Sequence, residues 1–269
     1  MVLTRLVKRV VIVAVAIYLA ATAFMYVNQR GFVFVPTGSL AMPQDKGLQG
    51  VTVSKVAMSD GTNVTVWSAP PRDPGLPTVL YLQGNSGNLS SRASRFAQIL
   101  ESGFGLYAPS YRGYAGSEGS PSETMLISDA LEQLDRLSAT GTQVILHGES
   151  LGTGIATAVA AQRDGVELVV LEAPYTALVD MARESYPWLP VGLLMKDQMP
   201  TRERIQAVSA PILIVHGVED RLIDAEHARR LFRLAPEPKD LLLIDGAGHA
   251  NLWSNGLWQA VLDYRDRLR

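Results

Sequence analysis

Six short runs of aliphatic residues, separated by segments of helical periodicity, constrain the fold of this chain more than any other feature. Continuous Val, Ile and Leu runs of this length are typical of strands that are buried on both faces of a sheet. We therefore predict strands at Val79–Gln83, Gly105–Ser110, Val144–His147, Leu168–Leu171, Ile212–His216 and Leu241–Ile244.

The segments between these runs have the pattern of helices, which we predict near 91–102, 121–138, 151–163, 225–235 and 252–268. In the second segment, Ser120, Pro121 and Glu123 have the spacing of a capping box, so we expect the helix to begin there. The regular alternation of strands and helices predicts an α/β fold, with a mostly parallel twisted sheet and helices on both faces.

An antiparallel hairpin is predicted ahead of the alternating segments. Val51–Val56 and Val64–Trp67 have strand character, and Ser59, Asp60 and Gly61 form a turn signal between them. One domain over residues 31–269 accounts for all these elements, and its length is within the range of a single large domain.

A different kind of segment precedes this domain. Val10–Val27 contains no charge, proline or glycine, and as a helix it would extend over roughly 27 Å, close to the thickness of a bilayer's hydrocarbon layer. Arg5, Lys8 and Arg9 come before it. This basic flank predicts a single-pass anchor within residues 1–30, a cytoplasmic N-terminus, and a domain on the extracytoplasmic side, which is the periplasm in a bacterium.

A cleavable signal peptide is the alternative interpretation of the same segment. Ala21, Thr22 and Ala23 match the small-residue pattern of a cleavage site. The apolar run is longer than the roughly 7–15 residues usual for a signal peptide, which favours the anchor. Both interpretations predict export of the domain.

The charged residues are unevenly distributed. The chain has 24 Lys+Arg and 26 Asp+Glu; residues 1–27 hold three of the basic residues and none of the acids, so the rest has 21 against 26, or −5. This negative balance argues against a nucleic-acid partner.

The chain has no cysteine, which excludes disulfides, thiolate metal sites and a cysteine nucleophile. We expect no metal or organic cofactor.

The motif Gly148-Glu149-Ser150-Leu151-Gly152 follows one predicted strand and precedes a predicted helix rich in small residues. That context is the one required for the nucleophile elbow of a serine hydrolase, in which a tight turn presents the serine hydroxyl. We predict Ser150 as the nucleophile.

A serine hydroxyl needs a general base, and His249 is the best candidate among four histidines. It lies in a glycine-rich loop after the last predicted strand, and Asp220 lies in the equivalent position after the preceding strand. The chain order Ser150, Asp220, His249 is that of an α/β-hydrolase triad. Glu219 and Asp224 remain alternatives for the acid.

The other three histidines have weaker claims. His147 and His216 lie in predicted buried strands and are expected to be structural, whereas His227 is expected to be exposed on a helix.

The loop over residues 81–88, after the first buried strand, is rich in glycine and asparagine. We predict that the backbone amides of Asn85 and Leu151 form the oxyanion hole, although Gly and Asn also make ordinary turns.

From about Arg30 onward the chain resembles the α/β-hydrolase superfamily, and within it the single-pass membrane group that includes the membrane-associated protein depalmitoylases of eukaryotes. Gln83 and Ser110 depart from the group's usual histidine and aspartate. The matching stretches are Leu82–Asn88, Tyr111–Glu123, the Ser150 elbow, Glu172–Thr176 and Leu194–Asp197. The resemblance implies the α/β-hydrolase fold, preceded by one transmembrane helix.

A short cap is expected at about 177–210, where relatives insert a lid. Its apolar segment Tyr186–Met195 is suited to an acyl pocket, to the membrane surface or to a packed connection. Together these features predict a membrane-anchored serine hydrolase that cleaves carboxylic esters or thioesters of small or lipid-like acyl groups through an acyl-enzyme. A serine peptidase or amidase of the same fold, and a catalytically silent binding protein, are the alternatives. The sequence assigns no oligomeric state.

Overall fold

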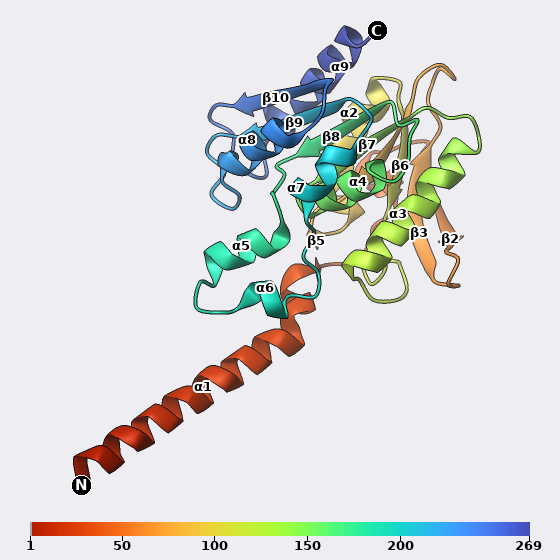
Figure 1. Ribbon diagram of the computed structural model, residues 1–269. Coiled ribbons are helices and arrows are strands. Elements are labelled where there is room, and N and C mark those ends of the chain that lie inside the picture. The colour runs from red at the N-terminus through yellow and green to blue at the C-terminus, as the bar shows by residue number, and fades with distance from the viewer. Residues whose placement is uncertain (1) are drawn as a thin grey trace.

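The computed structural model describes residues 2–269 and has an eight-stranded sheet at its centre (Figure 1). The strand order is β10-β9-β8-β7-β4-β6-β3-β2; β3 is antiparallel to both β2 and β6, and the other neighbours are parallel. The strands are β2 Thr52–Ala57, β3 Asn63–Ala69, β4 Thr78–Leu82, β6 Gly105–Pro109, β7 Val144–Glu149, β8 Leu168–Glu172, β9 Ile212–Gly217 and β10 Lys239–Ile244.

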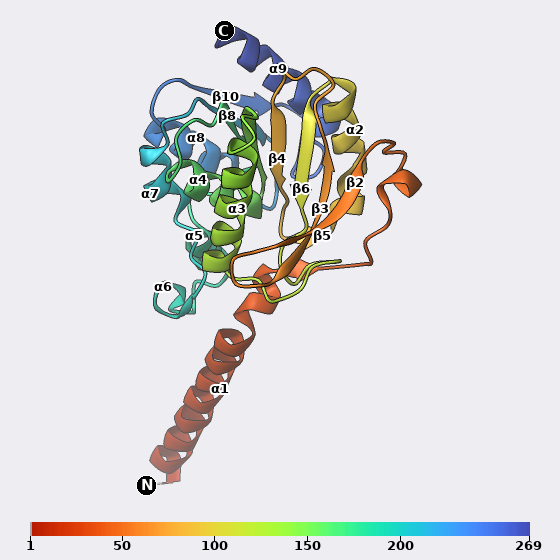
Figure 2. The same cartoon turned by 90° about the vertical axis from the view of Figure 1, so that its right-hand side faces the viewer.

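Helices cover both faces of this sheet (Figure 2). The helices α3, α4 and α8 contribute to one apolar core and α2 and α9 to the other, and β4 serves both, since Leu80 and Leu82 belong to the first core and Val79 and Tyr81 to the second. The bounds are α2 Ala93–Glu101, α3 Glu123–Ser138, α4 Leu151–Ala160, α8 Ala225–Leu234 and α9 Leu257–Arg267. The predicted α/β architecture is therefore confirmed, including its six core strands and the β2–β3 hairpin.

The start of α3 differs from the prediction. The helix begins at Glu123, and its N-cap is Ser122, whose Oγ accepts a hydrogen bond from the Met125 amide at 3.3 Å. The predicted capping box at Ser120 is wrong because the Glu123 carboxylate has other partners: it accepts the Met199 amide at 2.9 Å and pairs with Arg204 at 2.5 Å.

Three short α-helices lie between β8 and β9, in the stretch where the cap was expected. They are α5 Leu178–Ser185, α6 Val191–Leu194 and α7 Thr201–Arg204. Ala177, Val179, Leu189 and Val191 form a small apolar cluster there, against which Met25 of the N-terminal helix packs. This cap region is thus in contact with the N-terminal helix as well as with the sheet domain.

The N-terminal helix α1 (Val2–Val33) extends beyond the predicted apolar run at both ends and projects away from the sheet domain (Figure 1). Leu3–Val33 is long and apolar enough to span a membrane. After α1, a two-residue strand β1 (Val35–Pro36) pairs in parallel with β5 (Ser86–Gly87). The sequence offered no signal for this pair, because two residues are too short for a strand pattern.

Candidate active site

Ser150 occupies the turn between β7 and α4. Its backbone has φ 49° and ψ −113°, a left-handed conformation that is costly for a residue with a side chain. The turn is held because the Ser150 amide donates to the Glu172 carbonyl at 2.8 Å and the Ser150 carbonyl accepts from the Thr153 amide at 2.9 Å. Ser150 is therefore fixed at the N-terminus of α4, where the helix dipole favours negative charge.

Two glycines make this turn possible. A Cβ atom on Gly148 would lie 2.6 Å from the Gly152 carbonyl oxygen, and one on Gly152 would lie 2.0 Å from the Leu82 carbonyl oxygen. Both contacts are with backbone, which cannot rotate away as a side chain can. The motif therefore needs glycine two residues before and two residues after the serine, as expected from the close packing of the turn against β4.

The structure brings together the three side chains predicted from chain order. His249 Nε2 lies 3.1 Å from Ser150 Oγ, and His249 Nδ1 lies 2.7 Å from Asp220 Oδ2. The other oxygen of Asp220 accepts the Leu222 and Ile223 amides at 2.8 and 3.0 Å. Burial opposes the charge of Asp220, but the hydrogen bonds from His249 and the Ile223 amide outweigh it and lower the pKa of this carboxyl.

The two alternative acids have different surroundings. Asp224 is the N-cap of α8, where its Oδ1 accepts the Glu226 amide at 2.8 Å. Glu219 has an exposed side chain, and its backbone amide donates to the Ala247 carbonyl at 2.9 Å. Of the three carboxylates, Asp220 is the one in contact with His249.

The remaining histidines are all buried. His147 contacts Glu172 at 2.9 Å, and His216 contacts the Gly217 carbonyl at 3.0 Å, as suits strand residues. The expected exposure of His227 is wrong: its Nδ1 accepts the Thr176 amide at 3.2 Å, because the first turn of α8 packs on the loop after β8. In residues 2–269, no group of three or more His, Asp or Glu side chains is arranged to hold a metal ion.

The loop after β4, which carries Asn85, is held by its neighbours at successive backbone groups. The Gly84 amide donates to Glu149 Oε2 at 3.1 Å. The Asn85 carbonyl accepts the Val35 amide at 2.9 Å and the Tyr114 hydroxyl at 2.7 Å. These contacts fix the peptide units on both sides of the Asn85 amide.

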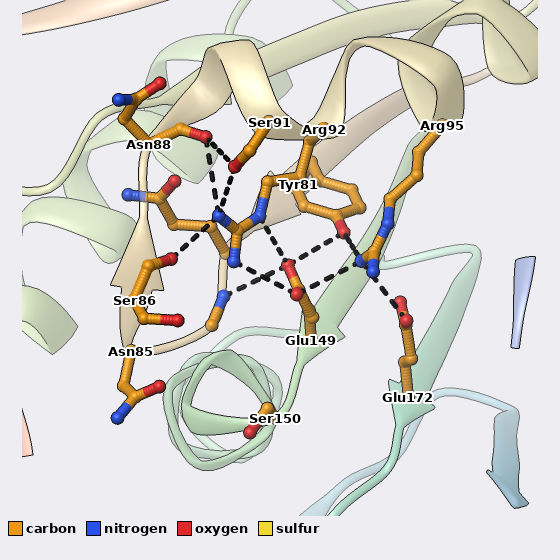
Figure 3. A network of polar contacts seen from close by, with 12 residues as sticks. Tyr81, Asn85, Ser86, Asn88, Ser91, Arg92, Arg95, Glu149, Ser150 and Glu172 are labelled. Carbon is orange, nitrogen blue, oxygen red and sulfur yellow. Dashed lines mark hydrogen bonds and ion pairs between the residues drawn. The ribbon is translucent and has the colours of Figure 1, made fainter. Parts of the chain in front are cut away.

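A network of buried charges lies on the other side of the elbow from the Ser150 hydroxyl (Figure 3). Glu149 pairs with Arg92 through both oxygens, at 3.0 and 3.1 Å, and with Arg95 at 3.2 Å. Arg95 also pairs with Glu172 at 3.2 Å, and the Tyr81 hydroxyl donates to Glu149 at 3.0 Å. We refer to Arg92, Arg95, Glu149 and Glu172 as the ion network.

Sequence reasoning missed the ion network. One signal was available: Arg92 and Arg95 lie three residues apart in a predicted helix and thus face the same direction. In the structure, burial opposes the charge of Glu149, but the attraction of Arg95 and Arg92 outweighs it and holds the pKa of this carboxyl well below its ordinary value. Arg92 Nη1 also donates to the Ser86 carbonyl at 2.7 Å. The ion network therefore joins the elbow to the Asn85 loop.

Comparisons with known proteins agree with this architecture. The family model described as alpha/beta hydrolase fold matches residues 77–194. The uncharacterized protein Rv2307c of Mycobacterium tuberculosis is 33% identical over 88% of this chain and 87% of its own length. The alpha/beta hydrolase domain-containing protein WAV2 of Arabidopsis thaliana is 26% identical over 78% of this chain and 76% of its own length.

A solved structure extends the agreement to the whole sheet domain. The esterase Pf2001 of Pyrococcus furiosus superposes with a TM-score of 0.67 and 16% identity, covering 88% of this chain and 96% of the esterase. At that identity the likeness concerns the fold. The family model, the related sequences and this fold together show that this chain belongs to the α/β-hydrolase family.

Proposed function

We propose that the protein is a serine hydrolase that cleaves carboxylic esters or thioesters through an acyl-enzyme on Ser150. The observation that carries the proposal is the position of His249, whose two ring nitrogens contact Ser150 Oγ at 3.1 Å and Asp220 Oδ2 at 2.7 Å. This is the arrangement in which a histidine deprotonates a serine hydroxyl while a carboxylate orients the ring.

In the first step, Ser150 Oγ attacks the substrate carbonyl carbon and its proton passes to His249 Nε2. The carbonyl oxygen becomes an oxyanion, which the amides of Asn85 and Leu151 stabilise. Each such donor is typically worth about 3 kcal/mol. Asp220, kept ionised by its hydrogen bonds, stabilises the imidazolium that forms.

The tetrahedral intermediate then breaks its bond to the leaving alcohol or thiol, which receives the proton from His249. In the second step a water molecule attacks the acyl-enzyme carbonyl and gives its proton to His249. The bond to Ser150 Oγ breaks, the acid leaves, and Ser150 recovers its proton from His249. His249 thus accepts and returns the proton in every proton transfer of the cycle.

We further propose that α1 anchors the protein in a membrane, with residues 1–30 as anchor and residues 31–269 as catalytic domain. The length and apolar surface of α1 support this, and Arg5, Lys8 and Arg9 favour a cytoplasmic N-terminus. A protease-accessibility assay on spheroplasts tests the orientation: digestion of the domain from outside is expected, and a protected domain would contradict it.

The nucleophile can be tested on the intact, membrane-inserted chain with a fluorophosphonate probe. We expect a covalent adduct that peptide mass spectrometry locates at Ser150, no adduct in Ser150→Ala, and an unchanged adduct in Ser185→Ala, which removes an exposed serine of the cap. A folded wild-type protein that forms no adduct would favour a catalytically silent binding protein instead.

The leaving-group class needs a second assay. We expect the protein to hydrolyse acyl esters and thioesters of graded chain length and to leave aminoacyl amides intact. Faster cleavage of the amides would favour a peptidase or amidase, which uses the same three side chains.

A further inference from the structure

The cap and the N-terminal helix contact each other at several levels along α1. One stripe of α1, which contains Tyr18, Met25 and Gln29, faces the cap. The contacts are Tyr18 with Trp188 (hydroxyl to carbonyl 3.3 Å, ring centroids 6.2 Å), Gln29 with Leu194 (3.2 Å) and Lys196 (2.7 Å), and Arg30 with Asp197 (2.8 Å). The cap therefore lies beside the second half of α1.

Two arginines define where a bilayer would lie on α1. Arg9 is the last charged residue before the apolar run and Arg30 is the first one after it. The 21 residues from one to the other correspond to about 31 Å of helix, close to the roughly 30 Å of a hydrocarbon layer. Because charged side chains are costly inside that layer, the apolar layer fits between Arg9 and Arg30 and nowhere else on α1.

The contact between Tyr18 and Trp188 then gives the depth of the cap. Tyr18 precedes Arg30 by twelve residues, or about 18 Å along the helix axis. A tilt of about 40°, the upper end of the usual range, reduces this to roughly 14 Å below the interface. In a bilayer placed in this way, Trp188 would therefore lie at the level of the acyl chains in any common orientation of α1.

The segment that reaches this depth has the composition of a membrane-inserted segment. Residues 186–195, which we call the cap tip, carry no charge, whereas Glu184 and Lys196 flank them. Trp188 and Leu193 are 49% and 88% exposed, although both are apolar. An exposed apolar surface that adjoins a membrane-spanning helix indicates contact with lipid.

The backbone of the cap tip is also suited to lipid, where water does not satisfy free amides. Pro187 and Pro190 have no N–H group to satisfy. Several of the other amides bond within the cap: Tyr186 to the Ala182 carbonyl at 2.8 Å, Val191 to Leu189 at 2.8 Å, Leu193 to Pro190 at 3.0 Å and Met195 to Val191 at 2.8 Å.

We propose that the cap tip is embedded in the hydrocarbon layer of the membrane beside α1, and that its partner is the acyl chains of the lipids. This rests on the proposed membrane anchor. The cap tip also forms one wall of an apolar groove, with Leu189 and Val191, and α1 forms the other wall with Met25 and Tyr26. In this arrangement the groove faces the acyl chains.

Tryptophan fluorescence offers a direct test, because Trp188 is the exposed tryptophan. Trp67, Trp253 and Trp258 are buried in the sheet domain. The full chain is reconstituted in phosphatidylcholine vesicles whose acyl chains carry bromine, a contact quencher, at a shallow or a deep position. We expect bromine to reduce the emission of the wild type, and the reduction to be several-fold smaller in Trp188→Phe.

Matched variants in the Trp188→Phe background place the probe elsewhere. Leu193→Trp should restore quenching, whereas Leu268→Trp should not, since Leu268 lies near the C-terminus at the end of the molecule opposite to α1 (Figures 1 and 2). Equal quenching of Trp188→Phe and wild type, or no quenching of wild-type protein that floats with the vesicles, would overturn the proposal. Protein that fails to float would contradict the anchor instead, and fluorophosphonate labelling reports separately on the hydrolase.

Discussion

The Ser150 site and the cap are built by opposite means. The site lies at the ends of buried strands, and Gly148 and Gly152 pack so closely on backbone that no other residue fits. The cap consists of short helices with exposed apolar side chains, and its tip contacts α1. In the proposed function the two regions have different roles: the sheet domain positions the catalytic residues, and the cap with α1 determines where the protein binds its acyl substrates. Substitutions in one of the two regions therefore test whether the other region responds.

The largest effect is expected for Ser150→Ala. Loss of the nucleophile should reduce kcat/KM for a short-chain p-nitrophenyl ester by roughly 10⁴- to 10⁶-fold. The melting temperature should hardly change, because the hydroxyl is not needed to hold the turn. A matched change in the cap, Leu193→Ser, should leave hydrolysis of this water-soluble ester intact. Substantial turnover by Ser150→Ala would show that Ser150 is not the nucleophile.

Asp220→Asn should have the next largest effect. The amide cannot orient His249 Nδ1–H as the carboxylate does, and loss of that orientation typically costs about 10³- to 10⁴-fold in kcat. Steady-state kinetics measures the loss. Glu219→Gln is the matched control, since Glu219 precedes Asp220 but has an exposed side chain. A larger loss in Glu219→Gln than in Asp220→Asn would reassign the acid.

The sequence predicted the sheet and the grouping of Ser150, Asp220 and His249 because those features are local. Each strand is a continuous apolar run, and each of the three residues follows a strand whose carboxyl end lies at the same edge of the parallel sheet. The chain order of the three then identified the family. His227 was misplaced because its burial depends on the Thr176 loop, which no local pattern reveals.

The ion network and the short helices inside the cap were not predicted, for related reasons. Glu149 stands at a variable position of the elbow motif, and its partners Arg92 and Arg95 are more than 50 positions away in the chain. The cap helices α6 and α7 have four residues each, too few to show a period. Contacts of this kind arise from tertiary packing, which no local sequence pattern reveals, so neither the ion network nor these helices could be predicted.

A third prediction concerns Glu149, which belongs to the site but touches no reacting atom. Glu149→Gln retains the shape but removes the charge that balances Arg92 and Arg95, so the Gly84–Asn85 loop should lose its fixed position. We expect kcat to fall about 10- to 100-fold with little change in KM, since misplacement of about 1 Å has such effects. The free energy of unfolding should fall by about 3 kcal/mol.

The control for this variant is Asp135→Asn, which breaks the exposed pair with Arg163. Exposed pairs contribute about 0–1 kcal/mol, so neither kcat nor stability should change much. If Glu149→Gln lowers stability but leaves kcat unaltered, the ion network stabilises the fold without positioning the oxyanion loop.

A fourth prediction follows from the pKa of Glu149, which its arginine partners lower from 4.5 to about 2. A carboxyl with a depressed pKa in the folded state contributes stability that is fully present above its unfolded pKa and is lost as the pH falls through the folded value. The stability difference between wild type and Glu149→Gln should therefore be constant above about pH 5 and decrease toward pH 2. Urea denaturation at several pH values measures it; a difference independent of pH would contradict the assigned charge.

The smallest effect is expected where the cap meets α1. Asp197 accepts the Glu123 amide at 2.8 Å and pairs with Arg30, which is half exposed. Asp197→Asn should weaken both contacts and lower the free energy of unfolding by roughly 1 kcal/mol, since one partner is solvated. Hydrolysis of a water-soluble ester should be unchanged, whereas hydrolysis of a long-chain ester held in vesicles should fall slightly, because one of the contacts that hold the cap beside α1 is weakened. An equal loss on both substrates would mean that the cap acts on the chemistry directly, and that the two regions are not separable.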